Sequence, residues 1–322
     1  MFTKIFDALP PPKFLDVPVA GISISDTSLH CIQFGRKGGN LYIEKYAERE
    51  ITPGVVVSGQ INNKSQVVKM LEDLKNELKL SHVKVSLPEE KAYLFTDKIP
   101  TVKPSEIRGV IESTIEDNVP LPGQELIFDY KVISHHQEKG HIDISVSAMP
   151  RSLIDTYLDI INTAGLKVVS LEIESQAIAK AVLKEGIKGT VLLTNFGKEK
   201  VGLYVAHNRI IHFASTVLLK DPLARDLSNI SKEIKKLFEY WYVLTENIDK
   251  PEKKISQIIV CGENLPDKIV SYLSIHNTTK TSLANVWSNV FDLNDTVPTI
   301  SLSDSLRYAT AIGLILPLNI LI

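Results

Sequence analysis

The chain is poor in cysteine, in net charge and in long apolar runs, and each shortage excludes a class of protein. It has only Cys31 and Cys261, each inside an apolar run, which argues against a disulfide framework and favours buried, reduced thiols. The 36 basic and 38 acidic residues give a formal charge of −2, so broad nucleic-acid binding is not expected. What remains, with 44% hydrophobic and 23% charged residues, is an ordinary globular protein with room for two substantial cores.

No membrane-spanning segment is expected either. The N-terminus lacks the continuous apolar run of a signal peptide, and the apolar run over residues 311–322 is short and interrupted by Pro317. The sequence therefore predicts a cytosolic protein, which could still work at a membrane through a partner. Apolar residues at helical spacing in residues 1–15 form either a small membrane-surface anchor or a packed terminus, and the short length favours the second: Phe2, Ile5, Phe6 and Leu9.

Two segments half a chain apart have the same build, and this repeat is the most informative feature of the sequence. Each contains an apolar strand, a tight turn of small and polar residues, and a second apolar strand; the segments cover residues 19–34 and 190–205. A third strand follows a short turn, at residues 38–40 in one case and 207–209 in the other. The repeat predicts two related half-molecules that face each other. Turns of this kind expose backbone N–H groups, which can bind phosphate.

Hydrophobic periodicity and helix-end signals predict the remaining elements. Helices are expected over residues 59–80, 104–118, 151–164, 175–184, 223–246, 267–273 and 303–314. Further strands are expected over residues 83–87, 92–95, 128–133, 142–147, 167–173 and 255–261. Asn63 or Ser65 is a plausible N-cap of the first helix, and Gly165 ends the third. Strands followed by helices indicate parallel pairing and an α/β fold.

These elements predict a chain of two lobes. Residues 1–16 form an N-terminal extension. Residues 17–188 form the first lobe, with a compact α+β insert over 50–149. Residues 189–322 form the second lobe, with a helical subdomain over 221–254.

In this order, the pieces resemble the actin-like ATPase superfamily, and more closely the PilM family of type IV pilus assembly proteins, relatives of the cell-division protein FtsA. The resemblance covers about residues 17–316 and is carried by several stretches in addition to the two turns. These are Pro120-Leu121-Pro122-Gly123 with Asp129-Tyr130, Ala148-Met149-Pro150-Arg151, Leu171-Glu172-Ile173-Glu174, Tyr240-Trp241-Tyr242 and Tyr308-Ala309-Thr310-Ala311-Ile312-Gly313-Leu314. The resemblance implies duplicated ribonuclease-H-like cores with a nucleotide cleft between them.

The resemblance also assigns residues to that cleft, which in the family takes ATP with Mg²⁺. The nucleotide-binding positions it implies are Gly21, Ser23, Ser25, Asp26, Thr27, Asn195, Gly197, Lys198, Glu233, Gly262 and Glu263. No catalytic residue and no resident metal ligand is assigned.

Several of these positions depart from the family pattern. The family turns carry an Asp-x-Gly core, whereas this chain has Ser23-Ile24-Ser25 and Asn195-Phe196-Gly197, so both metal-holding carboxylates are absent. Ser25 also adds a Cβ where the backbone must approach phosphate. The adenosine motif is reduced to Gly262-Glu263-Asn264. Asp26 could replace a lost ligand, or it could cap the turn by accepting from backbone N–H groups, the commoner role of Asp in a turn.

Two functions are consistent with these observations. The first is a cytoplasmic scaffold, peripheral to the inner membrane, that binds the N-terminal tail of a PilN-like membrane protein and has a degenerate nucleotide cleft. In the family the tail docks in a groove between the first subdomain and the insert, and here that groove should involve the inner faces of the 104–118 helix and the 50–149 sheet. The second is an active ATPase that polymerises or switches, with nucleotide binding without turnover as a middle case. Further partners implied are pilus ATPases or a second copy of the chain.

Three smaller features have simpler interpretations. His135, His136 and His141 flank one predicted hairpin, but their spacing matches no known ligand set, so an exposed turn is expected. Trp241 and Trp287 are expected in the core. The tail of residues 316–322 resembles the Leu-Asn-rich peptide of PilN-like tails and could occupy a groove, although packing on the last helix is favoured.

Overall fold

The chain folds around two five-stranded sheets with the same topology. The computed structural model describes residues 17–37, 40–219, 227–244, 247–263, 265–291 and 297–317. The first sheet has the order β10-β6-β1-β2-β3, with β1 (Val19–Ile24), β2 (Ser28–Lys37), β3 (Asn40–Glu50), β6 (His82–Leu87) and β10 (Lys167–Ile173). The second has the order β13-β12-β11-β14-β15, with β11 (Thr190–Phe196), β12 (Lys200–His207), β13 (Ile210–Leu218), β14 (Ile255–Gly262) and β15 (Lys280–Leu283).

Each sheet is an antiparallel three-stranded meander extended by two parallel strands. In the first sheet β6 pairs parallel to β1, and β10 parallel to β6. In the second β14 pairs parallel to β11, and β15 parallel to β14. The predicted duplication of a strand–turn–strand unit is therefore confirmed. The short strand β15 was not predicted, since its four residues carry no clear alternation.

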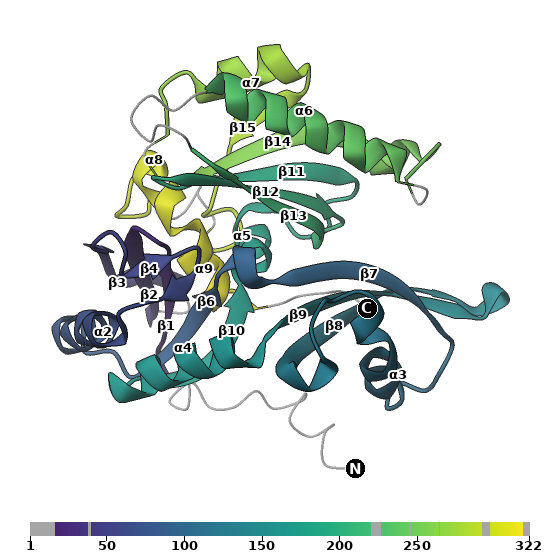
Figure 1. The fold of residues 1–322 in the computed structure, drawn as a ribbon. Helices are drawn as coiled ribbons and strands as arrows, with labels where there is room; N and C mark the ends of the chain where they lie inside the picture. Colours follow the sequence, from purple (N-terminus) through teal and green to yellow (C-terminus); the bar gives the residue numbers. More distant parts are fainter. Residues whose placement is uncertain are drawn as a thin grey trace.

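Helices cover both outer faces and fill the space between the sheets (Figure 1). The first sheet packs against α2 (Lys64–Leu78) and α4 (Arg151–Thr163), and the second against α6 (Leu227–Val243) and α7 (Ile269–Asn277). Between the sheets lie α5 (Glu174–Val182) and α9 (Ala309–Ile315), preceded by the short α8 (Leu302–Ser305). Each outer layer buries its own apolar cluster, and a third cluster joins α5, α9 and the second sheet.

Two glycines let the central helices approach their neighbours. A Cβ on Gly313 of α9 would lie 1.8 Å from the carbonyl oxygen of Ala177 in α5. A Cβ on Gly21 of β1 would lie 2.0 Å from the carbonyl oxygen of Ala311. These contacts are closer than any side chain allows, so they fix α9 between β1 and α5.

A separate three-stranded antiparallel sheet projects from the first lobe. It has the order β7-β9-β8, with β7 (Tyr93–Pro100), β8 (Leu126–His136) and β9 (His141–Pro150). Its core packs against α3 (Ile107–Thr114). The expected insert over residues 50–149 therefore begins too early: β6 lies in the middle of the first sheet, and α2 packs on that sheet's core.

The predicted helix over 59–80 also begins too early. Lys64 is its first residue, and Asn63 is the N-cap, with a side chain that accepts from the N–H of Gln66. The residues before it form a hairpin of β4 (Val56–Val57) and β5 (Gln60–Ile61), in which Gly59 has φ +74°. Gly165, with φ +73°, ends α4 as predicted.

The predicted burial of the two tryptophans and the two cysteines is confirmed. Trp241 and Trp287 are 1% and 2% exposed, and Cys31 and Cys261 are buried and free. No helix among the described residues is long and apolar enough to cross a membrane. The predicted features of residues 1–15, Asn264, and residues 318–322 of the tail lie outside the described residues. Leu316, at the start of the tail, packs in the cluster around α9.

Candidate functional site

The two duplicated turns face each other across a small cleft between the sheets. Its lining includes Ser23 and Ser25 from the first turn region, Asn195 and Gly197 from the second, and Glu263 after β14. Its volume is about 50 Å³. Pockets that hold small molecules measure roughly 300–1,000 Å³. The cleft has the position expected of a nucleotide site but a small fraction of the required volume.

The first turn, between β1 and β2, is closed by its own serine. The Oγ of Ser25 accepts from the N–H of Ser28 at 2.9 Å and from the N–H of Thr27 at 3.3 Å, and it lies 2.9 Å from the Oγ of Ser28. The N–H of Ser25 donates to the carbonyl of Ser28 at 2.8 Å. The N–H groups of Thr27 and Ser28, which a phosphate-binding turn would offer to a ligand, already have an internal acceptor.

Asp26 has a different role from both of those predicted. Its carboxylate accepts from the backbone N–H groups of Ser58 and Gly59, at 3.0 and 2.9 Å. It therefore caps the neighbouring β4–β5 hairpin and not its own turn, and the turn-capping side chain is Ser25. Its remaining partner is a lysine from the opposite lobe, whose Nζ lies 3.1 Å from Oδ2 of Asp26.

That lysine, Lys200, is the first residue of β12, directly after the second turn. Its ammonium forms ion pairs with Asp26 and with Glu90, and these three side chains are 12–16% exposed. Burial works to lower the pKa of Lys200, but the carboxylates of Glu90 and Asp26 outweigh it and hold the pKa above its usual value. A fixed cation from the second lobe thus sits among carboxylates of the first.

Two further glutamates belong to this network. Glu174, at the start of α5, accepts from Asn195 Nδ2 at 2.9 Å and from the Tyr204 hydroxyl at 3.4 Å. It borders the cleft and is half-buried, and its desolvation there raises its pKa to about 7. Glu89 is buried, accepts from the N–H of Ser175 at 2.9 Å, and has a pKa raised by burial to about 8. Burial therefore shifts both carboxylates towards the neutral form, against the attraction of the nearby Lys200 ammonium for Glu174.

The adenosine-motif position is filled by backbone. Gly262 has φ +112°, and a Cβ there would lie 2.2 Å from the carbonyl oxygen of Phe196. The N–H of Glu263 donates to the same carbonyl at 2.7 Å. The carboxylate of Glu263 turns into the cleft, where Oε1 accepts from the Ser28 hydroxyl at 3.2 Å. This segment is fastened to the second turn.

The structure brings together six of the eleven residues assigned to nucleotide: Ser23, Ser25, Asn195, Gly197, Gly262 and Glu263 line the cleft. The other five have different surroundings. Gly21 packs against α9, Asp26 caps the β4–β5 hairpin, and the carbonyl of Thr27 accepts from the N–H of Ile51. Lys198 pairs with Glu50 at 2.8 Å, and Glu233 pairs with Lys236 of the same helix.

Sequence reasoning missed Lys200, Glu90 and Glu174. Glu90 and Glu174 lie between predicted elements and Lys200 at the end of the second turn, where a lone charge has no periodicity to distinguish it. The contacts join Lys200 to Asp26 and Glu90, and Glu174 to Asn195, and only the fold brings these pairs together.

The residues present do not fit Mg-ATP. The two aspartates expected to hold the metal are Ser23 and Asn195, and the amide of Asn195 is already bonded to Glu174. The ammonium of Lys200 is paired with carboxylates at the mouth of the second turn. The lining carboxylates Glu90 and Glu263 would repel a triphosphate that no metal neutralises.

The expected groove for a partner's tail is also altered. The inner face of α3, with Ile107 and Ile111, and Ile115 directly after it are no more than 3% exposed and pack against the three-stranded sheet. The sheet contributes Ile142, Ile144 and Val146 to the same core. These two inner faces therefore contact each other, and the part of the expected groove that this core leaves is the junction of the insert with the first lobe.

A comparison with models of protein families finds a match over more than half of the chain. The model of a family described as type IV pilus assembly protein PilM matches residues 21–216. Among solved structures, the chain is similar to a PilM–PilN type IV pilus biogenesis complex, with 18% sequence identity, a TM-score of 0.77, and coverage of 92% of this chain and 97% of that one.

Two other solved structures share the architecture. Ethanolamine utilization protein EutJ from Carboxydothermus hydrogenoformans is 13% identical with a TM-score of 0.53, over 95% of this chain and 90% of that one. The cytoplasmic domain of EpsL, an inner-membrane component of the type II secretion system of Vibrio cholerae, is 10% identical with a TM-score of 0.51, over 91% and 94%. At these identities the likeness concerns the fold, and the predicted two-lobed actin-like fold is confirmed.

Proposed function

The chain belongs to the family of the type IV pilus assembly protein PilM, and from this premise we propose that it is a non-hydrolysing scaffold. It acts on the cytoplasmic side of an inner-membrane assembly platform, of a pilus or a related secretion system. There it holds the N-terminal tail of a PilN-like membrane protein. Its cleft binds no Mg-ATP and instead locks the two lobes together.

One observation carries the proposal: the cleft is bridged by the chain's own ion pairs. Lys200 from the second lobe reaches Asp26 and Glu90 of the first. In a cleft that binds Mg-nucleotide, a divalent cation and phosphates would link the two turns. Here an ammonium and two carboxylates provide that link without a ligand. Because Lys200 is already paired with both carboxylates, a nucleotide would have to displace these ion pairs.

The tail-binding role is supported by the family and by the PilM–PilN complex that the chain resembles over 92% of its length. An extended peptide can add to the free edge of a sheet. Strand β8 lies at one edge of the three-stranded sheet, and β10 lies at one edge of the first sheet. Both edges lie near the junction of the first lobe with the projecting sheet (Figure 1), which makes this junction the site we propose for the tail.

Calorimetric titration tests both parts of the proposal. The purified protein is titrated with Mg-ATP, and separately with a synthetic peptide that matches the N-terminal tail of a PilN-like protein. We expect saturable binding of the peptide and no heat of binding from Mg-ATP. Micromolar binding of Mg-ATP to the unaltered chain would reject the scaffold with a closed cleft and reopen the ATPase hypothesis.

A double variant supplies the positive control. Ser23→Asp with Asn195→Asp restores the two carboxylates that the family uses around Mg²⁺, and we expect it to gain Mg-nucleotide binding that the unaltered chain lacks. Hydrogen exchange with and without peptide then locates the tail. Protection of β8 or β10 supports the junction, whereas protection confined to the second lobe contradicts it.

A further inference from the structure

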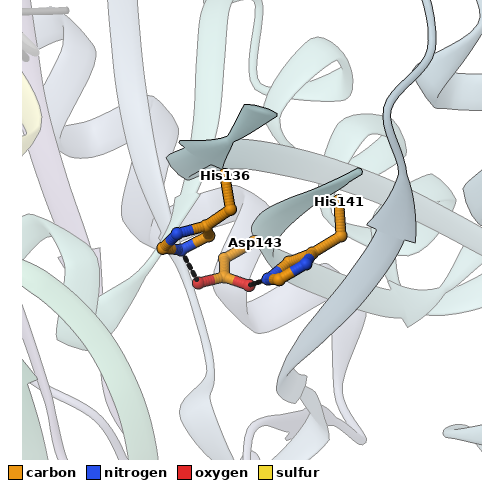
Figure 2. A group of neighbouring side chains, drawn as sticks. All are labelled: His136, His141 and Asp143. Carbon is orange, nitrogen blue, oxygen red and sulfur yellow. Dashed lines mark hydrogen bonds and ion pairs between the residues drawn. The ribbon is translucent and has the colours of Figure 1, made fainter. Parts of the chain in front are cut away.

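Two histidines and an aspartate meet at the tip of the projecting sheet, far from the cleft. His136 ends β8, and His141 and Asp143 lie at the start of β9 (Figure 2). The Nε2 of His136 is 3.0 Å from Oδ2 of Asp143, and the Nε2 of His141 is 3.5 Å from Oδ1. The imidazole rings are 4.7 Å apart and inclined by 32°. Both rings thus present the same nitrogen to the two oxygens of one carboxylate.

The hairpin register produces this arrangement. His136 pairs directly with His141, and Ser134 pairs with Asp143, after a bulge between Val132 and Ser134. Side chains two residues apart on a strand share a face, and directly paired residues have Cβ atoms about 5 Å apart. The bulge shifts the alternation, so that His136 joins the face of Asp143 while exposed His135 takes the other face. The sequence interpretation as a plain exposed turn overlooked Asp143.

We propose that His136, His141 and Asp143 bind a divalent transition-metal ion of the zinc class. Their ligand atoms all lie within 4.8 Å of one another, a spacing that one ion with bonds of about 2.0–2.2 Å can span after small movements. Oδ1 of Asp143 is buried and accepts no hydrogen bond within the described residues, so one ligand atom is available without loss. The Ser134 hydroxyl donates to Oδ2 at 2.9 Å and orients the carboxylate.

The donor set selects the kind of ion. Two imidazoles and a single carboxylate suit zinc, copper or nickel, whereas Mg²⁺ and Ca²⁺ require more oxygen ligands. The three ligands leave a fourth position towards a groove of about 580 Å³. Lys98, Lys139 and Lys250 line this groove. Their positive charge weakens the attraction of the site for a free cation, and Asp97 in the same lining offsets part of it. The same charge favours water, hydroxide or an anionic group as the fourth ligand.

The first experiment is a metal titration of the full chain after removal of metals with a chelator. We expect one Zn²⁺ per chain to bind, and Co²⁺ to give the visible absorption bands of a four-coordinate site. Mg²⁺ at the same concentrations is expected to give no saturable signal. Asp143→Asn and His141→Gln should each weaken Zn²⁺ binding by about 100-fold or more, since even partners outside the ligand shell change metal affinity by about 10–100-fold.

Two control variants separate this site from other donors. His135→Gln removes a neighbouring imidazole on the opposite face and is expected to leave Zn²⁺ affinity within about twofold. His30→Gln breaks the other three-residue donor group found among the described residues, that of His30, Glu48 and Glu263 in the cleft, and is expected to change nothing at the hairpin. Both cysteines are buried and do not compete.

The alternative is a metal-free cluster in which charged histidines pair with Asp143. It predicts no stoichiometric Zn²⁺ binding, or binding that Asp143→Asn and His141→Gln leave unchanged, and either result overturns the proposal. Circular dichroism confirms that each variant is folded. Should Asp143→Asn fail to fold, His136→Gln with His141→Gln in one chain provides the same test, because Ser134 still bonds the intact carboxylate.

Discussion

The two duplicated turns have the same backbone plan and opposite chemistry. In the first, between β1 and β2, the Ser25 hydroxyl accepts from the turn's own N–H groups. In the second, between β11 and β12, Gly197 has no side chain to do so, and its N–H donates to the carbonyl of Lys200. The side chain of Lys200 then leaves the turn and reaches the first lobe. The N–H groups of the first turn find their acceptor within the turn, whereas the second turn supplies an ammonium group to the first lobe.

This difference supports the proposal that the cleft stays closed without a ligand. A symmetric pair of phosphate-binding turns needs an anion and a metal to bring them together. Once one turn carries an internal acceptor and the other an ammonium, the lobes attract each other directly. The comparison predicts how much each residue contributes to the free energy of unfolding. Lys200 should contribute most, Gly262 next, the titrating glutamates less, and Ser25 least.

Removal of the Lys200 ammonium is expected to have the largest effect. Lys200→Met leaves the carboxylates of Asp26 and Glu90 without their cation, and loss of one partner of a buried pair costs about 3–5 kcal/mol. Urea unfolding should therefore give a free energy of unfolding lower by about 4 kcal/mol. Lys198→Met, whose partner Glu50 is 82% exposed, is the matched control and should change it by less than about 1 kcal/mol. Equal effects of the two variants would contradict the bridging role.

Gly262 fastens the segment after β14 to the second turn. In Gly262→Ala, a Cβ would meet the Phe196 carbonyl oxygen at 2.2 Å, and the residue would keep φ +112°. Strained backbone and a steric clash each cost about 1–3 kcal/mol, so a loss of about 3 kcal/mol is expected by chemical unfolding. The control Gly109→Ala, where no atom lies within 4 Å of the added Cβ, should be neutral or stabilising. A native-like Gly262→Ala protein would show that this segment can move away from β11.

The buried glutamates predict that stability falls as pH rises through neutrality. Their folded-state pKa values, about 7 for Glu174 and about 8 for Glu89, lie above the ordinary 4.5, so the folded state binds more protons than the unfolded state. The free energy of unfolding should drop by about 2 kcal/mol between pH 6.5 and 8. Below this window the neutral, buried histidines with lowered pKa values have the opposite effect: His30, His207 and His212.

Unfolding midpoints measured at several pH values check this prediction, with Glu174→Gln as the paired variant. The glutamine cannot ionise, so it should make the stability of the variant less dependent on pH than that of the unaltered chain. An identical slope for the two proteins would mean that Glu174 keeps an ordinary pKa in the folded state.

Much of the fold was predictable because it depends on local patterns. Alternation and turn residues located both meanders, and helix-end signals located Asn63 and Gly165. The limits of the insert were wrong because β6 looks the same in sequence whether it pairs with β7 or with β1. Pairing over 60 residues of separation leaves no trace in a single strand's pattern.

The site was predictable only in part, for a similar reason. The lost aspartates at Ser23 and Asn195 are visible in the sequence, since they occupy fixed places in a turn. The ion pairs that Lys200 makes across the cleft are not visible, because its partners are Asp26, held by the β4–β5 hairpin, and Glu90 of the opposite lobe. At the other end of the molecule, Asp143 joins two histidines only through the bulge in β8.

Ser25 provides the smallest and most specific test of the difference between the turns. Ser25→Ala removes the acceptor of the Thr27 and Ser28 N–H groups, at a cost of about 1 kcal/mol for a net hydrogen bond. It also releases those N–H groups, which a phosphate can then accept from. The thermal unfolding midpoint should therefore be higher in phosphate than in a phosphate-free buffer adjusted with NaCl to the same ionic strength for Ser25→Ala. For the unaltered chain the two midpoints should agree. If phosphate stabilises neither protein, the first turn lacks an anion-binding shape even when its own acceptor is gone.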